Sequence, residues 1–298
     1  MSLERPSLTF NELLVRSGVK LEETLVFRHR PIEPQLNKVF DVIVGEHPEL
    51  FDCYQSSHGP RTEAALSRAK FLASFVRFGP GLALFAGLYR VAGGRFLTVE
   101  EHRSNPLHQQ LIDLGMGGAF ASTGRNQIFA FDLPETKWGV DWKGRLVIKW
   151  PGLERSWYRW AERNRFEIEA ITIESQFTQD MPAWDRFTPN IAELKVLPSR
   201  WLEALRHWRG IYLITDLKDH RQYVGSAGGQ ENLLQRWLEY AKTGHGGNKH
   251  LRGRDPADFR FAILQRLSPD DDQRAVVAVE TSWKDRLQTR WPNGLNDN

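Results

Sequence analysis

The opening of the chain carries apolar residues at helical intervals. They recur every three or four residues in "TFNELLVRSG" (9–18) and in "PQLNKVFDVIVGEHPELFDCYQ" (34–55). Gly18 ends the first segment and Pro48 interrupts the second, as expected at helix boundaries. The pattern therefore predicts two or three short helices in this part of the chain.

After residue 70 the pattern changes to short apolar runs rich in β-branched and aromatic residues. Glycine- and proline-containing turns separate these runs, which is typical of strands. The runs lie at residues 71–78, 82–91, 126–133, 145–150 and 166–173. They predict a mixed sheet or a small barrel of about five strands. Residues 153–166 ("LERSWYRWAERNRF") instead have helical spacing, which would place Trp157 and Trp160 on one face.

A proline after a mixed segment marks the predicted domain boundary at Pro198. We expect a recognition domain at residues 1–198, helical at first and then β-rich, and a second domain at residues 199–298. Beyond the boundary, the predicted order is strand, turn, strand, helix, polar loop with a short helix, strand and helix, at residues 210–215, 216–221, 222–227, 231–244, 245–254, 258–267 and 273–289. The whole chain is therefore predicted to be of the α+β class.

Composition narrows the classes of protein that fit. The chain has 298 residues, 41% hydrophobic and 26% charged, as in ordinary globular proteins. It contains no run of 18 uncharged apolar residues and no apolar N-terminal run, so neither a membrane span nor a signal peptide is expected. The single cysteine, Cys53, forms no internal disulfide and no zinc-type spacing. We expect a cytoplasmic protein without membrane contacts.

The excess of positive charge lies entirely after Pro198. The first 198 residues carry 24 cationic and 24 anionic side chains, and the remaining hundred carry 16 and 13. Twelve of those sixteen cations are arginine, whose guanidinium matches the geometry of a phosphate. The balance hints at a polyanionic ligand, although a solvated surface would produce the same excess.

Several side chains of the second domain stand at positions that suggest a site. Tyr212 and Tyr223 lie on paired strands, and the turn register that decides whether they share a face is left open by the sequence. Arg236 and Tyr240 are four residues apart on a helix and therefore share a face. Glu280 borders an apolar helical stripe, where an unpaired charge is costly, so we expect a cationic partner, either an arginine or a metal.

The order of these residues resembles the GIY-YIG nuclease family. Gly210-Ile211-Tyr212 is followed after ten residues by Tyr223-Val224-Gly225, and an arginine stands eleven residues after the second glycine. A glutamate on a late helix and an asparagine in the terminal Gly294-Leu295-Asn296 complete the series. The resemblance covers about residues 208–298. It implies a small antiparallel three-stranded sheet flanked by helices, and hydrolysis of phosphodiester bonds.

The resemblance also implies roles for the residues that match the family pattern. Tyr212 and Tyr223 are the two active-site tyrosines, of which we favour Tyr212 as the base if nearby cations lower its pKa. Arg236 binds the phosphate, and Tyr240 contacts the phosphate or the attacking water. A tyrosine has an ordinary pKa of about 10, so its use as a base depends on its surroundings.

Glu280 and Asn296 complete the site that the resemblance implies. Glu280 binds one divalent metal ion and Asn296 is a polar residue that supports the site. A single carboxylate with waters and substrate oxygens suits Mg2+ or Mn2+. His245 and His250 lack the partner pair that a zinc site would need.

Cationic residues of the polar loop are candidates for substrate binding. A lysine that some members place directly after the second triplet is replaced here by Ser226. Lys249 is a candidate to supply that charge from another direction, and Arg252 and Arg254 follow it in the same loop. We therefore expect Lys249, Arg252 and Arg254 to contact the nucleic acid.

Nucleases of this type take their target choice from an attached domain, which implies that residues 1–198 are a reader. The segment 71–91 faintly resembles the hairpin of PUA-like barrels, which include readers of modified bases. Because this part of the chain is neutral overall, recognition of one flipped or altered base in a pocket suits it better than electrostatic binding of the DNA backbone. Interleaved Trp and Arg residues up to Arg165 would stack such a base, whereas a tryptophan core or a protein-interaction domain is the plainer reading.

His29, His47 and His58 are candidates for a second catalytic cluster, although solvated or core histidines would look the same. Taken together, these observations predict a metal-dependent DNA endonuclease of restriction or anti-phage type that acts on duplex DNA. A DNA-repair or structure-specific nuclease and a non-catalytic nucleic-acid-binding protein are the alternatives, and RNA is not excluded as the substrate. One catalytic centre per chain cuts one strand, so a clean double-strand break would need a homodimer on DNA or two successive nicks.

Overall fold

The computed structural model describes residues 8–117, 124–152, 156–178, 180–228 and 232–297. It divides into two compact units, Met1–Thr178 and Gln179–Asn298. This division lies before the boundary predicted at Pro198. The reason is that Phe187, Ile191 and Leu194 are buried in the same apolar core as the strands that follow Pro198.

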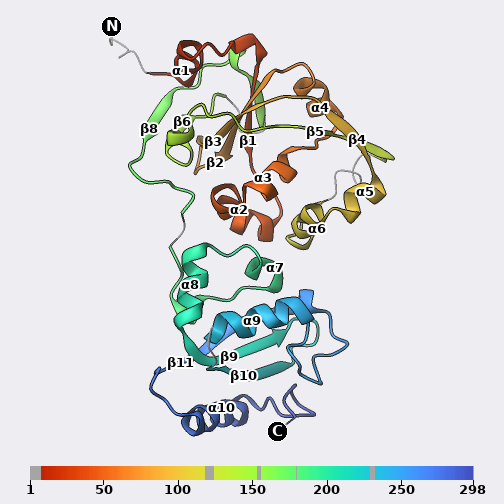
Figure 1. Cartoon of the computed structure of the whole chain (residues 1–298), viewed down its shortest axis with the longest axis vertical. Helices are drawn as coiled ribbons and strands as arrows, with labels where there is room; N and C mark the ends of the chain where they lie inside the picture. The colour runs from red at the N-terminus through yellow and green to blue at the C-terminus, as the bar shows by residue number, and fades with distance from the viewer. Residues whose placement is uncertain (1–7, 118–123, 153–155, 179, 229–231, 298) are drawn as a thin grey trace. The chain divides into compact units, whose positions relative to one another are not determined.

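A six-stranded mixed sheet forms the centre of the first unit (Figure 1). Its spatial order is β7 (Tyr158–Trp160), β1 (Thr24–His29), β2 (Phe71–Arg77), β3 (Leu82–Arg90), β6 (Leu146–Lys149) and β8 (Ile168–Ile171). Strands β1 and β2 are parallel, and the other neighbours are antiparallel. The predicted mixed sheet is confirmed, and the similarity to PUA-like barrels stays a prediction.

Short helices surround this sheet. They are α1 (Phe10–Arg16), α2 (Pro34–Glu46), α3 (Pro48–Gln55), α4 (Pro60–Leu66), α5 (Val99–Ser104) and α6 (Pro106–Asp113). Pro48 stands in the first turn of α3, where its missing N–H is tolerated, and so separates α2 from α3 as predicted. Strands β4 (Gly94–Thr98) and β5 (Gln127–Phe131) pair antiparallel in a separate two-stranded sheet.

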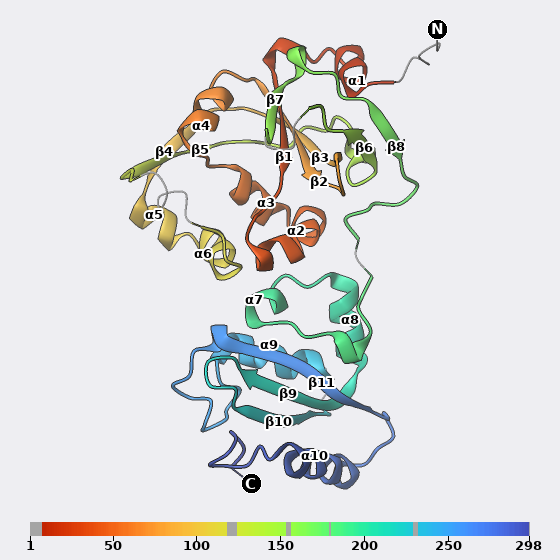
Figure 2. The same cartoon turned by 180° about the vertical axis from the view of Figure 1, so that it is seen from behind.

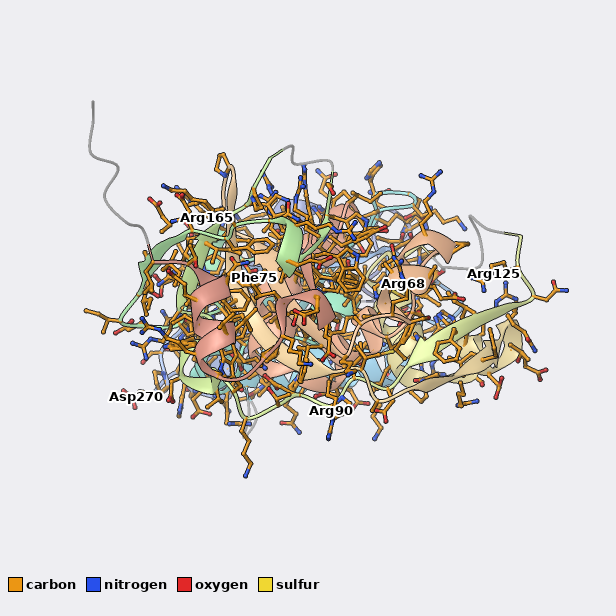
Figure 3. All side chains as sticks on the ribbon, turned by 90° about the horizontal axis from the view of Figure 1, so that it is seen from above. Arg68, Phe75, Arg90, Arg125, Arg165 and Asp270 are labelled. Atoms are coloured by element: carbon orange, nitrogen blue, oxygen red, sulfur yellow. The ribbon has the colours of Figure 1, made fainter. Side chains whose placement is uncertain are left out.

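The two faces of the sheet bury different side chains. On one face, Phe10 of α1 packs on Phe75 of β2, with the ring centroids 5.1 Å apart. On the other face, His29 at the end of β1 packs on Phe51 of α3 at 5.2 Å. Figure 3 shows Phe75 inside the first unit and charged residues such as Arg90 at its periphery.

The helix predicted at residues 153–166 is wrong. The described part of this segment contains β7, which pairs antiparallel with β1, followed by a short 3-10 helix at Ala161–Arg163. Because side chains alternate across a strand, the spacing of Trp157 and Trp160 separates them instead of aligning them. The ring centroids of Trp157 and Phe27 lie 4.9 Å apart, whereas the guanidinium of Arg68 lies over the ring of Trp160.

The second unit is built on a three-stranded antiparallel sheet with the order β10-β9-β11. The strands are β9 (Arg209–Asp216), β10 (Gln222–Ala227) and β11 (Phe259–Leu267), and the helices are α7 (Ile191–Leu194), α8 (Ser199–His207), α9 (Asn232–Thr243) and α10 (Gln273–Leu287). Helix α9 covers one face of the sheet and α10 the other, as Figures 1 and 2 both show. The predicted order of strands and long helices is confirmed.

The short helix expected in the polar loop 245–254 is absent from the described residues, which form turns there. Gly246, Gly247 and Gly253 adopt positive φ, which a right-handed helix does not accommodate. Within the described ranges, no helix is both long and apolar enough to span a membrane.

Candidate active site

Tyr212 and Tyr223 share one face of the sheet of the second unit. The hairpin register pairs Tyr212 with Gly225 and Tyr223 with Ile214, so the two tyrosines are diagonal neighbours on the face that α9 covers. Their ring centroids lie 6.4 Å apart. The question of register that the sequence left open is thereby answered.

Gly225 makes room for Tyr212. A Cβ at this glycine would stand 2.5 Å from the Tyr212 hydroxyl oxygen and 3.0 Å from the ring of Tyr223. Only a residue without a side chain lets both rings lie over β10 at this point. The glycine of the second triplet therefore has a steric function within the site.

Helix α9 brings a third tyrosine and an arginine to the same face. Tyr240 is fully buried, and its hydroxyl lies 3.1 Å from that of Tyr212. The guanidinium carbon of Arg236, one helical turn earlier, lies 5.5 Å from the centroid of the Tyr240 ring. Buried Leu233 and Trp237 anchor this face of α9 in the core. Gly246 lies against the Tyr240 ring, where a Cβ would stand 2.5 Å from it.

Burial divides the cluster into an inner and an outer pair. Burial raises the pKa of Tyr212, the neighbouring Tyr223 raises it further, and Arg236 lowers it only in part. Burial also raises the pKa of Tyr240, with Tyr212 as the next cause. Tyr223 and Arg236 are only partly buried. The pair that substrate can reach is therefore Tyr223 and Arg236.

This geometry bears on two expected roles. We favoured Tyr212 as the base; burial raises its pKa and its side chain is fully buried, and its role as the base stays a prediction. We expected Tyr240 to contact phosphate or water, but its hydroxyl is used by Tyr212 inside the core. Burial lowers the pKa of the Arg236 guanidinium, yet Tyr212 and Tyr240 raise it more, so Arg236 stays charged.

Glu280 lies on α10, the helix that covers the opposite face of the sheet. Its carboxylate accepts from Lys284 at 2.7 Å, and both side chains are largely buried. The expected cationic partner exists and is a lysine one turn along the helix, where its spacing of four residues could have indicated it. Among the described residues, no hydrogen bond joins Glu280 to the tyrosines or to Arg236.

The donor set suits a hard divalent cation held by few protein ligands. No group of three His, Cys, Asp or Glu side chains that could hold a metal is present in the described part of the chain. Mg2+ commonly binds through one or two carboxylates and completes its shell with waters and substrate phosphates. The carboxylate of Glu280 fits that chemistry, provided that Lys284 releases one of its oxygens.

Asn296 holds the edge of β10 next to Tyr223. Its side-chain oxygen accepts from the Val224 N–H at 2.9 Å, and its side-chain nitrogen donates to the Val224 carbonyl at 2.8 Å. The neighbouring Leu295 N–H donates to the Gln222 carbonyl, so this C-terminal segment satisfies the free edge of the strand. Asn296 is 3% exposed and supports the position of Tyr223 without being reachable itself.

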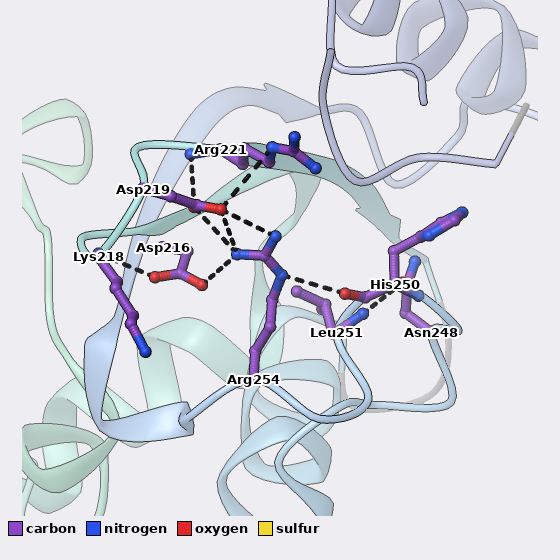
Figure 4. A network of polar contacts seen from close by, with 8 residues as sticks. All are labelled: Asp216, Lys218, Asp219, Arg221, Asn248, His250, Leu251 and Arg254. Carbon is purple, nitrogen blue, oxygen red and sulfur yellow. Dashed lines mark hydrogen bonds and ion pairs between the residues drawn. The ribbon is translucent and has the colours of Figure 1, made fainter. Parts of the chain in front are cut away.

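The three loop cations have different surroundings. The guanidinium of Arg254 binds the carboxylates of Asp216 and Asp219 where β9 turns into β10 (Figure 4). Because these two carboxylates already neutralise the guanidinium, Arg254 attracts a phosphate only weakly. Lys249 is mostly exposed and lies 3.6 Å from Asp297. Arg252 is exposed. Lys249 and Arg252 thus stay candidates for binding substrate, whereas Arg254 is better described as a link between the loop and the hairpin.

Comparisons with known proteins agree with this arrangement of residues. Residues 209–296 match the family model of the GIY-YIG catalytic domain. Among solved structures, the catalytic domain of the homing endonuclease I-TevI matches with 25% identity and a TM-score of 0.24, over 30% of this chain and 98% of that chain. No curated protein matches. The resemblance predicted from the sequence is confirmed over residues 209–296, and this match indicates a nuclease domain, a phosphodiester hydrolase.

Proposed function

We propose that this protein is a metal-dependent DNA endonuclease of restriction or anti-phage type, in which the first unit selects the DNA that the second unit cuts. The observation that carries the proposal is the cluster of Tyr212, Tyr223, Arg236 and Tyr240 on one face of a GIY-YIG domain. Only Tyr223 and Arg236 of this cluster are reachable.

Phosphodiester hydrolysis needs a positioned water and stabilisation of the charge that develops on the phosphate. Arg236 supplies a permanent positive charge and a planar set of donors suited to the non-bridging oxygens. The hydroxyl of Tyr223 orients the attacking water by hydrogen bonding. Tyr212 and Tyr240 hold this pair in position from inside the core.

Glu280 is the residue that would hold Mg2+ or Mn2+. When bound, such an ion stabilises negative charge on the phosphate and on the leaving 3′ oxygen. Lys284, which neutralises Glu280 in the free protein, would then turn towards the substrate or solvent. In this proposal Glu280 exchanges its ion pair with Lys284 for a metal ion. The active site would then be assembled only when DNA and metal are both present.

The first unit would supply specificity. Residues 1–198 have no excess of positive charge, so general attraction to phosphate cannot explain selection by this part of the chain. A pocket that recognises one flipped base would need little positive charge on the surface around it. Duplex DNA is the favoured substrate, and two chains acting together, or two successive nicks, would produce a double-strand break.

Cleavage of two DNA substrates tests the proposal. Supercoiled plasmid and base-modified phage DNA are incubated with the full chain and Mg2+, Mn2+ or EDTA. We expect cutting of at least one substrate with a metal, no cutting with EDTA, and loss of cutting in Glu280→Ala. Asp285→Ala removes an exposed carboxylate from the same helix and serves as the matched control. Metal-independent cutting, or full activity of Glu280→Ala, would contradict the proposed role of Glu280.

The repair alternative is tested with the same protein. A duplex with one lesion or a branched junction is compared with intact duplex of the same sequence. Cutting confined to the damaged or branched DNA would replace the restriction assignment by a repair nuclease. Binding of intact DNA without cutting of any substrate would favour the non-catalytic alternative.

A further inference from the structure

A cavity of about 460 Å3 lies within the first unit, between the end of β1, helix α3 and the segment before β7. Its lining includes His29, Tyr54, His58 and Trp157. The volume lies within the range of small-molecule sites and is large enough for a single nucleobase. None of these residues belongs to the nuclease domain.

Two buried histidines of this lining have a ring nitrogen without a partner. His29 is 2% exposed and His58 is 9% exposed, and Nε2 of each ring is buried and makes no hydrogen bond. A buried polar atom without a partner is uncommon and costs free energy unless something binds to it. The same two rings account for two of the candidates for a second catalytic cluster, and Glu33 also lines the cavity.

Both rings are neutral and offer an acceptor. Burial lowers the pKa of His29 to about 3 and that of His58 to about 4. Gln55 accepts a hydrogen bond from each ring, through its side chain from His29 and through its backbone from His58. Because Nε2 is the unpartnered atom, the proton of each neutral ring is on Nδ1 and the Nε2 lone pair is free. The two rings therefore carry unused acceptors beside the cavity, and a ligand with N–H donors would satisfy them.

The other lining groups favour a flat ring. The partly buried Trp157 packs beside His58, with ring centroids 5.6 Å apart, and Tyr54 lies 5.6 Å from His29. Such rings stack on planar heterocycles. The exposed Arg30 lines the same cavity and is a cation suited to a phosphate beside the bound ring. Among the described residues, no group of three or more His, Cys, Asp or Glu side chains is placed to hold a metal ion.

We propose that this cavity binds one base extruded from DNA, and that His29 and His58 accept hydrogen bonds from its exocyclic amino group. This inference rests on the proposed function, because it makes the first unit the reader that the nuclease domain uses. Cytosine and adenine carry such an amino group, whereas uracil and thymine present a carbonyl oxygen at the same position and would leave both acceptors unsatisfied.

Binding to DNA with one unpaired base tests the inference directly. Two duplexes are identical except for a single extrahelical base, dC in one and dU in the other, so that no unpairing energy is needed and the two bases differ in their hydrogen-bonding edge. Dissociation constants for the full chain are measured in EDTA, which keeps the DNA intact. We expect the dC bulge to bind about tenfold more tightly than the dU bulge, and more tightly than the fully paired duplex.

Variants locate this preference in the cavity. The double change His29→Phe and His58→Phe keeps both rings but removes both acceptors, and it should abolish the preference for dC. Trp157→Ala should weaken binding of both bulged duplexes. Trp160→Ala, on the neighbouring strand outside the cavity, and His47→Phe, a histidine away from it, are the matched controls and should change neither value. Circular dichroism and the unfolding temperature show whether each variant is folded.

Several outcomes would overturn the inference, and they differ from failure of the nuclease. Equal binding of dC, dU and paired DNA by the native chain contradicts it, as does an unchanged preference in a folded double variant. If the protein cuts DNA but shows no preference, the nuclease assignment stands and the cavity has another ligand. If it prefers the dC bulge but cuts no DNA, the cavity assignment stands and the nuclease role falls.

Discussion

The hydroxyl of Tyr212 lies 3.1 Å from the hydroxyl of Tyr240, inside the core of the second unit. Both side chains are fully buried, and we predict that this pair of phenols organises the site from within the core. The reachable members of the cluster, Tyr223 and Arg236, lie over and beside this pair. We therefore predict that the tyrosines of the two triplets have different functions, one structural and one chemical.

The Tyr212–Tyr240 hydrogen bond should be measurable as a coupling free energy. Tyr212→Phe leaves the buried Tyr240 hydroxyl without this partner and should lower the free energy of unfolding by about 1–3 kcal/mol, whereas Tyr240→Phe should cost less because Arg236 also bonds the Tyr212 hydroxyl. The double variant leaves none, so it should lose less than the sum of the two single changes. Urea unfolding, monitored by the spectroscopic transition of the second unit, gives the free energy of unfolding of the native chain, the two single variants and the double variant. Strict additivity would show that the two hydroxyls do not interact.

Gly225→Ala should damage the site through sterics alone. The added Cβ would stand 2.5 Å from the Tyr212 hydroxyl oxygen and 2.6 Å from its ring, so Tyr212 or β10 must move. We expect a loss of about 1–3 kcal/mol in stability and a large loss of cleavage. Ser226→Ala, the next residue on the same strand, is the control and should behave like the native chain. An unchanged melting temperature for Gly225→Ala would mean that the hairpin absorbs the methyl group.

Asn296 should be needed for the order of β10. Asn296→Ala removes two hydrogen bonds to the backbone of Val224, which lies between Tyr223 and Gly225. We expect faster hydrogen exchange of the Val224 amide, a loss of about 1–3 kcal/mol and reduced cleavage. Asn293→Ala, an exposed asparagine in the same terminal segment, is the matched control. If the Val224 amide in Asn296→Ala exchanged at the same rate as in the native chain, the proposed role of Asn296 in ordering β10 would be contradicted.

The first unit should lose stability in acid because of His29 and His58. Burial holds their pKa values at about 3 and about 4, below the ordinary value near 6.5 of the unfolded chain. Between these values the unfolded state binds more protons, so their contribution is complete above pH about 6.5 and decreases as pH falls towards 4. Each histidine contributes a slope of about 1.4 kcal/mol per pH unit.

Other groups near these rings modify the slope. Burial raises the pKa of Asp52 to about 6, so this carboxyl stabilises the folded state as pH falls and acts in the opposite direction. Glu63 raises the pKa of His58 slightly, against burial. The test is therefore a difference: urea unfolding from pH 7 to pH 4 should show a shallower dependence in the His29→Phe and His58→Phe double variant. Equal slopes would mean that the rings are not buried in the neutral form.

Much of the fold was predictable because its strands are uninterrupted apolar runs. Residues 71–77 and 82–90 are buried at nearly every position, mostly by aliphatic and aromatic side chains, and turn residues bound them. The prediction for the segment around Trp157 failed because this segment is not an apolar run. Its charged and aromatic residues fit a helical period as well as a short edge strand. Strand β1 was missed because its buried Arg28 and His29 interrupt the apolar pattern that marks a central strand.

The chemistry of the site was predictable in type but not in arrangement. The two triplets and Arg236 identified the family, because their order is carried by the sequence itself. The shared face of Tyr212 and Tyr223 depends on the hairpin register, which nothing local specifies. The burial that makes Tyr212 a poor base comes from α9 and the core beneath it, and such a long-range effect has no local signal. The cavity of the first unit likewise brings together residues far apart in the chain.

The most direct test of the central claim compares cleavage by two variants of the reachable pair. Plasmid nicking with Mg2+ is timed for the native chain, Tyr223→Phe, Arg236→Ala and the control Gln235→Ala, whose side chain is exposed next to Arg236 on α9. We expect Tyr223→Phe and Arg236→Ala to slow nicking by at least about 100-fold while staying folded, and Gln235→Ala to keep the native rate. Native rates in both site variants would contradict the claim that Tyr223 and Arg236 carry the hydrolysis.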